Sequence, residues 1–217
     1  FKFVSRTAQE SVVLERFDDY WGEKPDLTKV TYKIIENADS ILLSLQSGAV
    51  DVFAHLTTNQ IQQLGDGFHV EEGTMNLVQA LYLNNAEKPF DDVRVRQALC
   101  YAIDRQQILE ELLNGHGEIV DGFLSSASPF YDDSLTPISY DPEKAKALLE
   151  EAGWDGSQTI RFYVNSGDST FVNAASIIAA EWAAVGIKAE IQTVDFATLM
   201  SVAGTEDYLS LIHISEP

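Results

Sequence analysis

The sequence predicts an α/β fold with mixed sheets flanked by helices, and two βαβ patterns support that prediction. The clearer pattern joins an alternating strand at Thr159–Val164, a helix from Phe171 to Val185 and a second strand at Ile187–Val194. An earlier pattern joins strands at Lys29–Ile35 and Val50–Ala54 through a helix. Because a βαβ crossover makes neighbouring strands parallel and lays a helix over them, both patterns predict layered α/β structure.

The other elements of the N-terminal part follow from caps and alternation. Asn37–Asp39 supplies caps for a helix that Gly48 closes, and Thr57 or Thr58 caps a shorter helix through Leu64. Strand-like patterns occur in the segments 1–6, 11–16, 29–35, 50–54, 68–72 and 77–84. We therefore expect an N-terminal hairpin followed by the first βαβ unit.

The block LYLNNAEKPFDDVRVRQALCYAIDR, which begins at Leu81, predicts a strand, a proline turn and two capped helices. Asp91 or Asp92 is placed to cap the first helix. Asp104 opens the second helix, where its side chain is expected to accept from the amide of Gln107. Gln107 is expected to reach back in a capping-box arrangement.

The C-terminal half repeats these signals. Asn114 ends the second helix, and the Ser, Gly, Asp and Pro content of Gly115–Tyr140 predicts a long surface loop. Asp141 is a natural N-cap, and Pro142 fits the first turn of the helix that follows. Asp195 is placed to cap one more helix after the last βαβ strand.

Four segments, in order along the chain, resemble the signature of a known family. They are Glu15–Gly22, Leu45–Asp51, the block that begins at Leu81 with its Pro-Phe-Asp-Asp-Val-Arg-Val-Arg-Gln-Ala-Leu run, and Tyr140–Ala145. Such segments are typical of the solute-binding proteins of peptide and nickel ABC importers. The departures from the family pattern are small, at Phe17 and Cys100.

The resemblance implies a two-lobed, periplasmic-binding-protein-like (type II) architecture, of which this chain would be an incomplete, internal part. It places residues 1–83 in the lobe that carries the termini of the full protein and residues 84–208 in the second main lobe. The strand through Asn84 would cross between the lobes. Because the sheets of such a piece have unpaired edges, we expect it to be marginally stable, aggregation-prone and unable to bind ligand at native affinity.

The last residues have a different character. Residues 209–217, LSLIHISEP, resemble the translated read-through of a sequencing-library adapter rather than any part of the family. We therefore predict a non-native tail in this segment. The alternative is an ordinary apolar strand at Leu209–Ile214.

Composition excludes several classes of function. The formal net charge of −20 argues against binding to nucleic acid or to an anionic membrane, since both need clustered Lys and Arg. The simplest role of the acidic excess is to keep the protein soluble. Cys100 is the single cysteine, so neither an internal disulfide nor a multi-thiol metal site is expected. No apolar run approaches the roughly 18 residues that span a bilayer.

Catalytic and metal-binding patterns are not found in the sequence. His55, His69 and His116 are scattered, without a helical i, i+4 pair or a cysteine neighbour. Adjacent acidic pairs such as Asp91-Asp92 fit caps and turns better than a reacting carboxylate pair. Since no phosphate loop or dinucleotide fingerprint is present either, we expect no catalytic residue, no metal and no cofactor.

A ligand site is easier to motivate. The loop Asn165–Ser169 follows a strand and opens a helix, so its amides and hydroxyls suit a polar or anionic ligand group. The alternative for Asp168 is a plain N-cap, and for Phe171 it is core packing. For Tyr82 and Asn84, on the strand that the resemblance places between the lobes, the alternative is packing within a hinge. The candidate ligand-binding residues are Tyr82, Asn84, Asn165, Ser166, Asp168, Ser169 and Phe171.

The resemblance implies a monomeric extracytoplasmic receptor, periplasmic or lipid-anchored on the outer face of the cytoplasmic membrane. It would bind an oligopeptide, a dipeptide or a similar polar solute between two lobes and deliver it to the permease subunits of an ABC importer. It would not be an enzyme. Two alternatives stay open: a secreted peptide or glycan hydrolase that uses His116 or Asp168, and a ligand-sensing module without transport.

Overall fold

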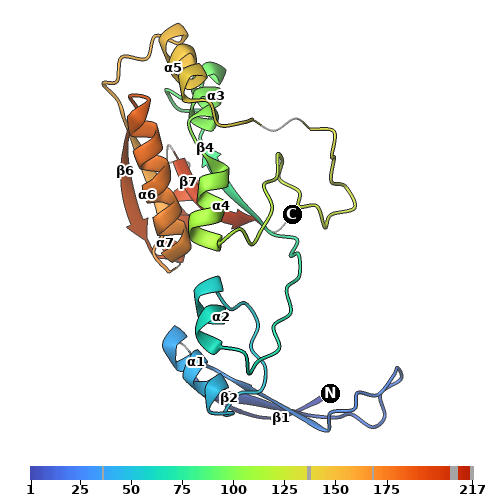
Figure 1. Cartoon of the computed structure of the whole chain (residues 1–217). Helices are drawn as coiled ribbons and strands as arrows, with labels where there is room; N and C mark the ends of the chain where they lie inside the picture. Colours follow the sequence, from blue (N-terminus) through green and yellow to red (C-terminus); the bar gives the residue numbers. More distant parts are fainter. Residues whose placement is uncertain (36, 136–137, 168, 206–209, 216–217) are drawn as a thin grey trace. The chain divides into compact units, whose positions relative to one another are not determined.

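Figure 1 shows the computed structural model of the chain, which describes residues 1–35, 37–135, 138–167, 169–205 and 210–215. The chain divides into two compact units, unit 1 from Phe1 to Glu71 and unit 2 from Glu72 to Pro217. Each unit combines strands with helices, which confirms the predicted α/β class.

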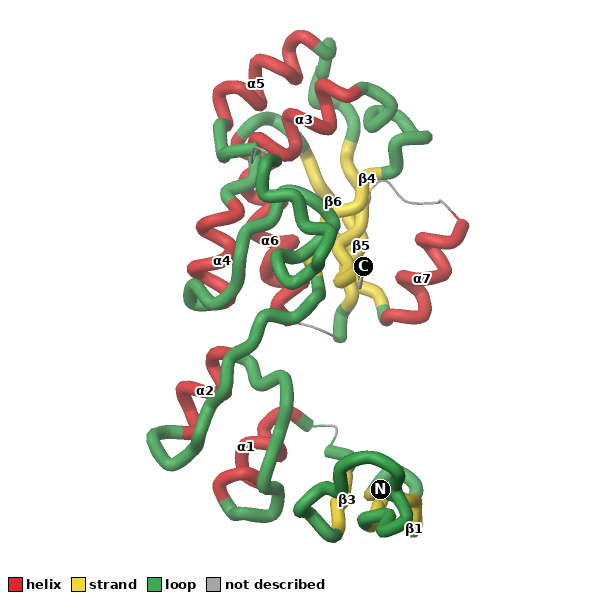
Figure 2. The backbone as a smooth tube through the Cα atoms, turned by 90° about the vertical axis from the view of Figure 1, so that its right-hand side faces the viewer, coloured by secondary structure: helices red, strands yellow, loops and turns green. Residues whose placement is uncertain are grey.

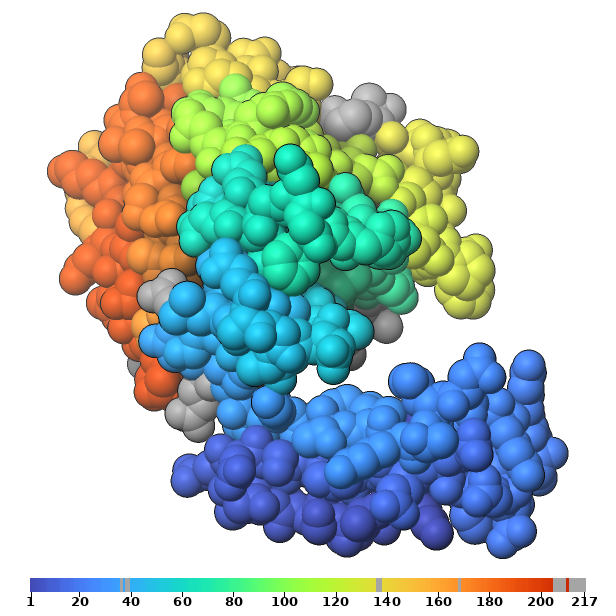
Figure 3. Space-filling view, turned by 60° about the horizontal axis from the view of Figure 1, so that its bottom comes forward, coloured from blue at the N-terminus to red at the C-terminus, as the bar shows by residue number. Residues whose placement is uncertain are grey.

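Unit 1 begins with an antiparallel sheet of β1 (Lys2–Thr7), β2 (Ser11–Glu15) and β3 (Lys29–Lys33). Leu14 pairs with Phe3 on one side and with Val30 on the other, so apolar side chains of all three strands share one face. Tyr32 joins that face by pairing with Val12. The face is open, since Phe3 is 65% and Tyr32 60% exposed. In the space-filling view of Figure 3 the N-terminal residues of unit 1 are drawn in the darkest blue.

The rest of unit 1 is built on α1 (Ala38–Gln46) and α2 (Thr58–Leu64). The predicted caps are confirmed: the Asn37 side chain accepts from the Ser40 amide, and Thr57 forms a capping box. Both helices bury apolar side chains in a small cluster. Its buried members are Ile41, Leu42, Leu45 and Leu64, with Ile35, Val50, Leu56 and Phe68 packed against them.

The first predicted βαβ unit is wrong. Residues 50–54 and 68–72 form no strand, and β3 pairs antiparallel with β2. Val50 and Phe68 pack against the cluster of α1 and α2 instead. Their apolar character therefore reflects contact with helices, which alternation alone does not distinguish from burial in a sheet.

Unit 2 contains a mixed sheet in the order β4-β7-β5-β6. Its strands are β4 (Val78–Leu83), β5 (Thr159–Asn165), β6 (Lys188–Val194) and β7 (Ser210–Ser215). β5 runs parallel to β6 and β7, whereas β4 runs antiparallel to β7. The crossover from β5 to β6 is α6 (Ser169–Ala184), so the predicted second βαβ unit is confirmed.

Helices cover this sheet on both faces. Figure 2 shows α4 (Arg105–Leu113) and α6 on one side of the strands and α7 (Phe196–Thr205) on the other. Phe162 and Val164 of β5 point into the main core, while Tyr163 between them packs with Leu199 of α7. Trp182 of α6 is fully buried in the main core, and its ring centroid lies 5.4 Å from that of Phe162.

The helix caps of unit 2 follow the prediction with one exception. Asp92 caps α3 (Val93–Tyr101), and Asp141 caps α5 (Pro142–Glu151). Asp104 accepts from the Gln107 amide as expected, but Gln107 does not complete a capping box, because its side chain donates to Glu111. The Asp104 amide donates instead to Glu181 of α6, 3.2 Å away.

The two compact units divide between Glu71 and Glu72, and this division does not test the predicted lobe boundary after residue 83. β4 pairs with β7 and belongs to the unit 2 sheet, so the strand through Asn84 does not separate the two units. The register of this strand depends on residues far along the chain, which local patterns do not reveal. The assignment of the units to lobes of a full-length protein stays a prediction.

The segment predicted to be a tail contains a strand. Ser210–Ser215 forms β7, while residues 209, 216 and 217 lie outside the described part of the chain. Ser210 is fully buried next to its cross-strand neighbours Phe162 and Leu83. Within the described residues its hydroxyl has no hydrogen-bond partner, which is costly at a core position. A non-native origin of the segment stays a prediction.

Glu181 gives a test of how α4 is attached to α6. Burial raises the pKa of its carboxyl group. The hydrogen bond from the Asp104 amide lowers this pKa, and the charges of Asp104 and Glu111 raise it by like-charge repulsion. An acid with a raised folded-state pKa favours folding while it is protonated, and this contribution is lost as the pH rises through that pKa. We therefore expect Glu181→Gln, which keeps an acceptor for Asp104, to raise stability at pH 7. In urea unfolding the gain should disappear below about pH 4. A gain that is independent of pH would contradict this account.

Candidate functional site

The predicted ligand loop lies where the parallel strands β5 and β6 end. The Asn165 side chain accepts from the Gly167 amide at 3.0 Å, and the Ser166 amide donates to the Val194 carbonyl at 2.8 Å. These bonds fix the loop to the ends of both strands and leave Ser166 and Ser169 exposed. The loop therefore presents hydroxyls at the edge where α/β proteins commonly bind ligands.

Two other candidates near this loop have different outcomes. Asp168 lies outside the described residues. Phe171 is 4% exposed and belongs to the main core of unit 2, which supports its packing alternative. The part of the predicted set that is both described and accessible at this edge is Ser166 and Ser169, supported by Asn165.

The structure does not bring Asn84 to the same edge. Leu81 and Val164 share a row of the sheet through Ile212. Asn165 lies one residue beyond this row, and Asn84 lies three residues beyond it in the opposite direction. Asn84 and Asn165 are therefore separated by about 13 Å along the strands. The Asn84 side chain is buried and accepts from the Ala86 amide, so it stabilises the turn that follows β4.

Tyr82 lies closer, on the α7 face of the sheet. It shares a row with Tyr163 through Leu211, and both tyrosines pack with the cluster around Leu199. The ring of Phe123, from the loop 115–140, lies 6.1 Å from the Tyr82 ring and is 65% exposed. Sequence patterns did not identify this contact, because an irregular loop gives no register.

A carboxylate follows β6 at the same edge as the ligand loop. Asp195 caps α7, and the Thr198 amide, followed by the Thr198 hydroxyl, holds the pKa of its carboxyl group below the usual range. The edge therefore carries a negative charge one residue beyond Val194, whose carbonyl accepts from the Ser166 amide. Asp195 follows β6 directly, so the rule that parallel strands end at one edge of a sheet predicts its place here from the sequence, in addition to its cap.

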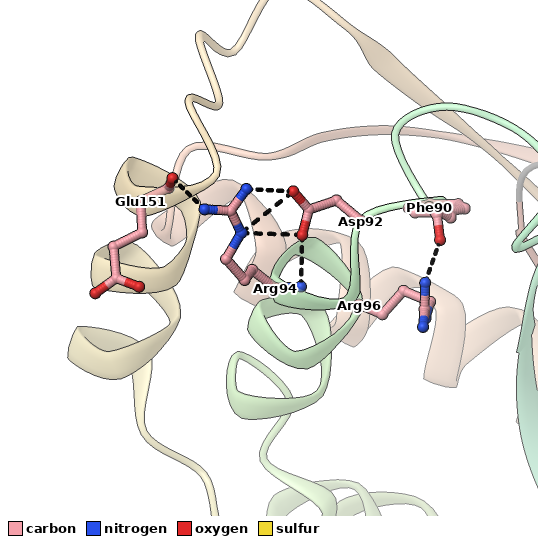
Figure 4. Close-up of polar contacts among 5 residues, drawn as sticks. All are labelled: Phe90, Asp92, Arg94, Arg96 and Glu151. Atoms are coloured by element: carbon pink, nitrogen blue, oxygen red, sulfur yellow. Dashed lines mark hydrogen bonds and ion pairs between the residues drawn. The ribbon is translucent and has the colours of Figure 1, made fainter.

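The residues of the family-like block serve mainly to hold helices together. Figure 4 shows Arg94 donating to both carboxylate oxygens of Asp92 and, at 2.6 Å, to the Glu151 carbonyl at the end of α5. The hydrogen bond from the Arg94 side chain is the main reason why the pKa of Asp92 falls to about 2. Arg96 donates to the Phe90 carbonyl. These contacts tie α3 to α5 and to the preceding turn.

In the described part of the chain, no group of metal-ligating side chains lies at the edge of the sheet that carries the ligand loop. A polar groove of about 640 Å³ lies between the start of α3 and the end of α5, next to Asp92 and Trp154, and contains none of the candidate ligand residues. Within the described residues, no group of three or more His, Cys, Asp or Glu side chains is arranged to hold a metal ion. Nδ1 of His116 lies 3.1 Å from a carboxylate oxygen of Glu72.

Comparison with known proteins supports the resemblance found in the sequence. A family model described as "Bacterial extracellular solute-binding proteins, family 5 Middle" matches residues 1–211. The dipeptide-binding protein of Escherichia coli (strain K12) is 32% identical over 193 residues, which are 86% of this chain and 36% of that protein. Heme-binding protein A of Haemophilus influenzae is 30% identical over 209 residues, 91% of this chain and 37% of that protein.

The fold agrees with solved structures. The periplasmic binding protein DppA from Helicobacter pylori, in complex with the peptide STSA, matches 100% of this chain and 42% of its own with a TM-score of 0.83 at 24% identity. The predicted type II fold is confirmed, and the chain covers only part of it. The chain also spans little more than a third of the curated relatives above. Among the described helices, none has the length and apolar character needed to cross a bilayer.

Proposed function

Because this chain belongs to the bacterial extracellular solute-binding proteins of family 5, we propose that it forms part of a receptor that binds a dipeptide or oligopeptide outside the cytoplasm. The receptor passes its ligand unchanged to the permease subunits of an ABC importer. The match of the family model to residues 1–211 is the observation that carries this proposal.

Peptide is the ligand class with the most support. The Escherichia coli relative is a dipeptide-binding protein, and the Helicobacter pylori structure holds a peptide. The Haemophilus influenzae relative is named for heme, so the family fold alone does not select the ligand. The exposed hydroxyls of Ser166 and Ser169 favour a ligand rich in hydrogen-bonding groups, and a peptide backbone offers both donors and acceptors.

We place ligand contact at the end of β5, with Ser166 and Ser169 as hydrogen-bonding residues and Asp195 as a nearby negative charge. Tyr82 and Phe123 supply an aromatic surface on the α7 face of the same sheet. A hydrolase is the weaker alternative. Its proposed histidine, His116, is paired with Glu72, and both side chains are more than half exposed, which gives no enclosed reaction site.

The cellular setting follows from the same proposal. Such a receptor works as a monomer, in the periplasm or attached by a lipid to the outer face of the cytoplasmic membrane. Its partners are the permease subunits and the captured peptide. Closure of two lobes over the ligand would favour the bound state, because only the closed form completes the contacts to both lobes.

The serine pair provides the test. In a full-length protein that carries this chain, we expect Ser166→Ala and Ser169→Ala each to weaken peptide binding about fivefold, since each removes one hydrogen bond worth about 1 kcal/mol. Isothermal titration calorimetry with a dipeptide and an oligopeptide series measures the effect. Ser176→Ala is the matched control, because the Ser176 hydroxyl is exposed and bonds within α6 to the Val172 carbonyl.

The possible outcomes distinguish an error in the proposed contact site from an error in the proposed receptor function. Unchanged affinity in both loop variants would reject this loop as the contact site while leaving the family function intact. Peptide cleavage by the purified protein, detected by mass spectrometry and abolished by His116→Ala, would reject the receptor in favour of a hydrolase. Tight binding without any interaction with a permease would favour a sensing module.

A further inference from the structure

The connection between the two units is an extended segment without helix or strand. It runs from Gly65, after α2, to Leu77, before β4, and is visible in Figures 1 and 2 as a long irregular stretch. Both ends are anchored: Leu64 is buried in the cluster of unit 1, and Val78 is buried in unit 2. How these residues are held decides where the chain is free to bend.

Unit 2 holds the second half of this segment through two side-chain contacts. Both carboxylate oxygens of Glu72 lie 3.1 Å from Nδ1 of His116. The Ser125 hydroxyl donates to the Asn76 side chain at 2.8 Å, and Ser125 is only 5% exposed. The Glu72–His116 contact alone is modest, because both side chains are exposed to solvent. Together they attach both ends of Glu72–Asn76 to the loop 115–140.

That loop is itself fixed to α4, so the attachment is to a firm support. The Arg105 guanidinium donates to the carbonyls of Val120 and Ile138 and to the carboxylate of Asp121. Asp121 is largely buried, with 16% of its side chain exposed. Arg105 thus joins two distant points of the loop to the first turn of α4.

The first half of the segment is held by the other unit, and only as far as Phe68. Phe68 packs against the apolar cluster of α1 and α2. Beyond it, His69, Val70 and Glu71 are exposed, and the polar contact that the structure shows for these three described residues is the local pair between His69 and Glu71. This pair joins residues within the segment and attaches them to neither unit.

We infer that bending between the units is concentrated in His69–Glu71, with Glu72–Asn76 moving as part of unit 2 because His116 and Ser125 hold it. The inference goes beyond the proposed function, and its test needs no ligand. A failure would therefore leave the receptor proposal unaffected.

The test compares the mobility of spin labels on either side of Glu72. In the complete chain with Cys100 replaced by alanine, labels are attached at Val70→Cys and Thr74→Cys, both exposed positions. We expect electron paramagnetic resonance to show a mobile label at position 70 and a restricted label at position 74. Adding His116→Ala and Ser125→Ala should raise the mobile fraction at position 74 severalfold and leave position 70 unchanged.

His69→Ala is the matched control, since it removes a histidine–carboxylate pair that attaches to neither unit. It should leave the label at position 74 restricted. Glu72→Gln weakens one contact without changing the loop, and it should also raise the mobility of the label at position 74. This variant replaces the double variant if circular dichroism shows that the double variant is poorly folded. Equal mobility at positions 70 and 74 in the parent chain, or no response to either set of changes, would overturn the inference.

Discussion

Trp182→Ala is expected to remove about 3 to 5 kcal/mol of stability from unit 2. The Trp182 side chain is fully buried, packs on Phe162 and donates from Nε1 to the Leu99 carbonyl at 3.2 Å. Leu99 belongs to the last turn of α3, whose carbonyls lack partners within the helix. The substitution therefore opens a large cavity and also leaves a buried acceptor unpaired. Because domains are commonly stable by only about 5 to 15 kcal/mol, a large fraction of this stability would be lost.

Urea unfolding followed by circular dichroism measures this loss, and two variants separate its causes. Trp182→Phe retains most of the ring volume but lacks the donor, so it should cost about 1 kcal/mol. Trp21→Ala is the matched control, since Trp21 is 90% exposed and its removal should change stability by less than about 0.5 kcal/mol. Equal destabilisation by Trp182→Ala and Trp21→Ala would show that the core is not organised around Trp182.

The success of sequence-based prediction depends on the range of the interactions. Asp92, Asp141 and Asp195 cap helices as predicted, because a cap is settled by residues two or three positions away. The amide of Asp104 is different: its partner is Glu181, which becomes a neighbour only when α4 packs on α6. The sequence around Asp104 therefore does not predict the contact with Glu181, which is 77 residues away.

The same distinction applies to the strands and to the candidate site. The β5–α6–β6 unit was recognisable because its apolar alternation and its helix lie in one continuous stretch. Residues 50–54 have similar composition but form no strand, and Val50 packs against the cluster of α1 and α2 instead. For the site, the Asn165 loop was predictable from its place between strand and helix. The position of Asn84 depended on the register between β4 and β7, which is set by residues more than 100 positions apart.

Arg105→Met is expected to release the loop 115–140 from α4 at a cost of about 3 kcal/mol. Methionine keeps much of the apolar stem but removes the hydrogen bonds to the Val120 and Ile138 carbonyls. It also leaves the largely buried carboxylate of Asp121 without its cation. Cleavage by chymotrypsin at Phe123, which is 65% exposed, should accelerate about tenfold or more, since local opening of the loop becomes easier.

A double-mutant cycle with Asp121→Asn identifies the source of the effect. If the charge pair matters, the double variant should cost clearly less than the sum of the single ones, because the first substitution already breaks the interaction. Lys146→Met is the control: it removes an exposed ion pair with Glu143 and should leave cleavage unchanged.

The Arg105 result also bears on the connection between the units, since the loop that Arg105 holds is the support for Glu72 and Asn76. Releasing the loop should therefore raise the mobility of a label at Thr74 without altering a label at Val70. Faster cleavage at Phe123 combined with a label at Thr74 that stays restricted would mean that His116 and Ser125 keep their places without Arg105. His116 lies only two residues beyond Asn114, the cap of α4. In that case the end of α4 alone would be sufficient to hold His116 in place.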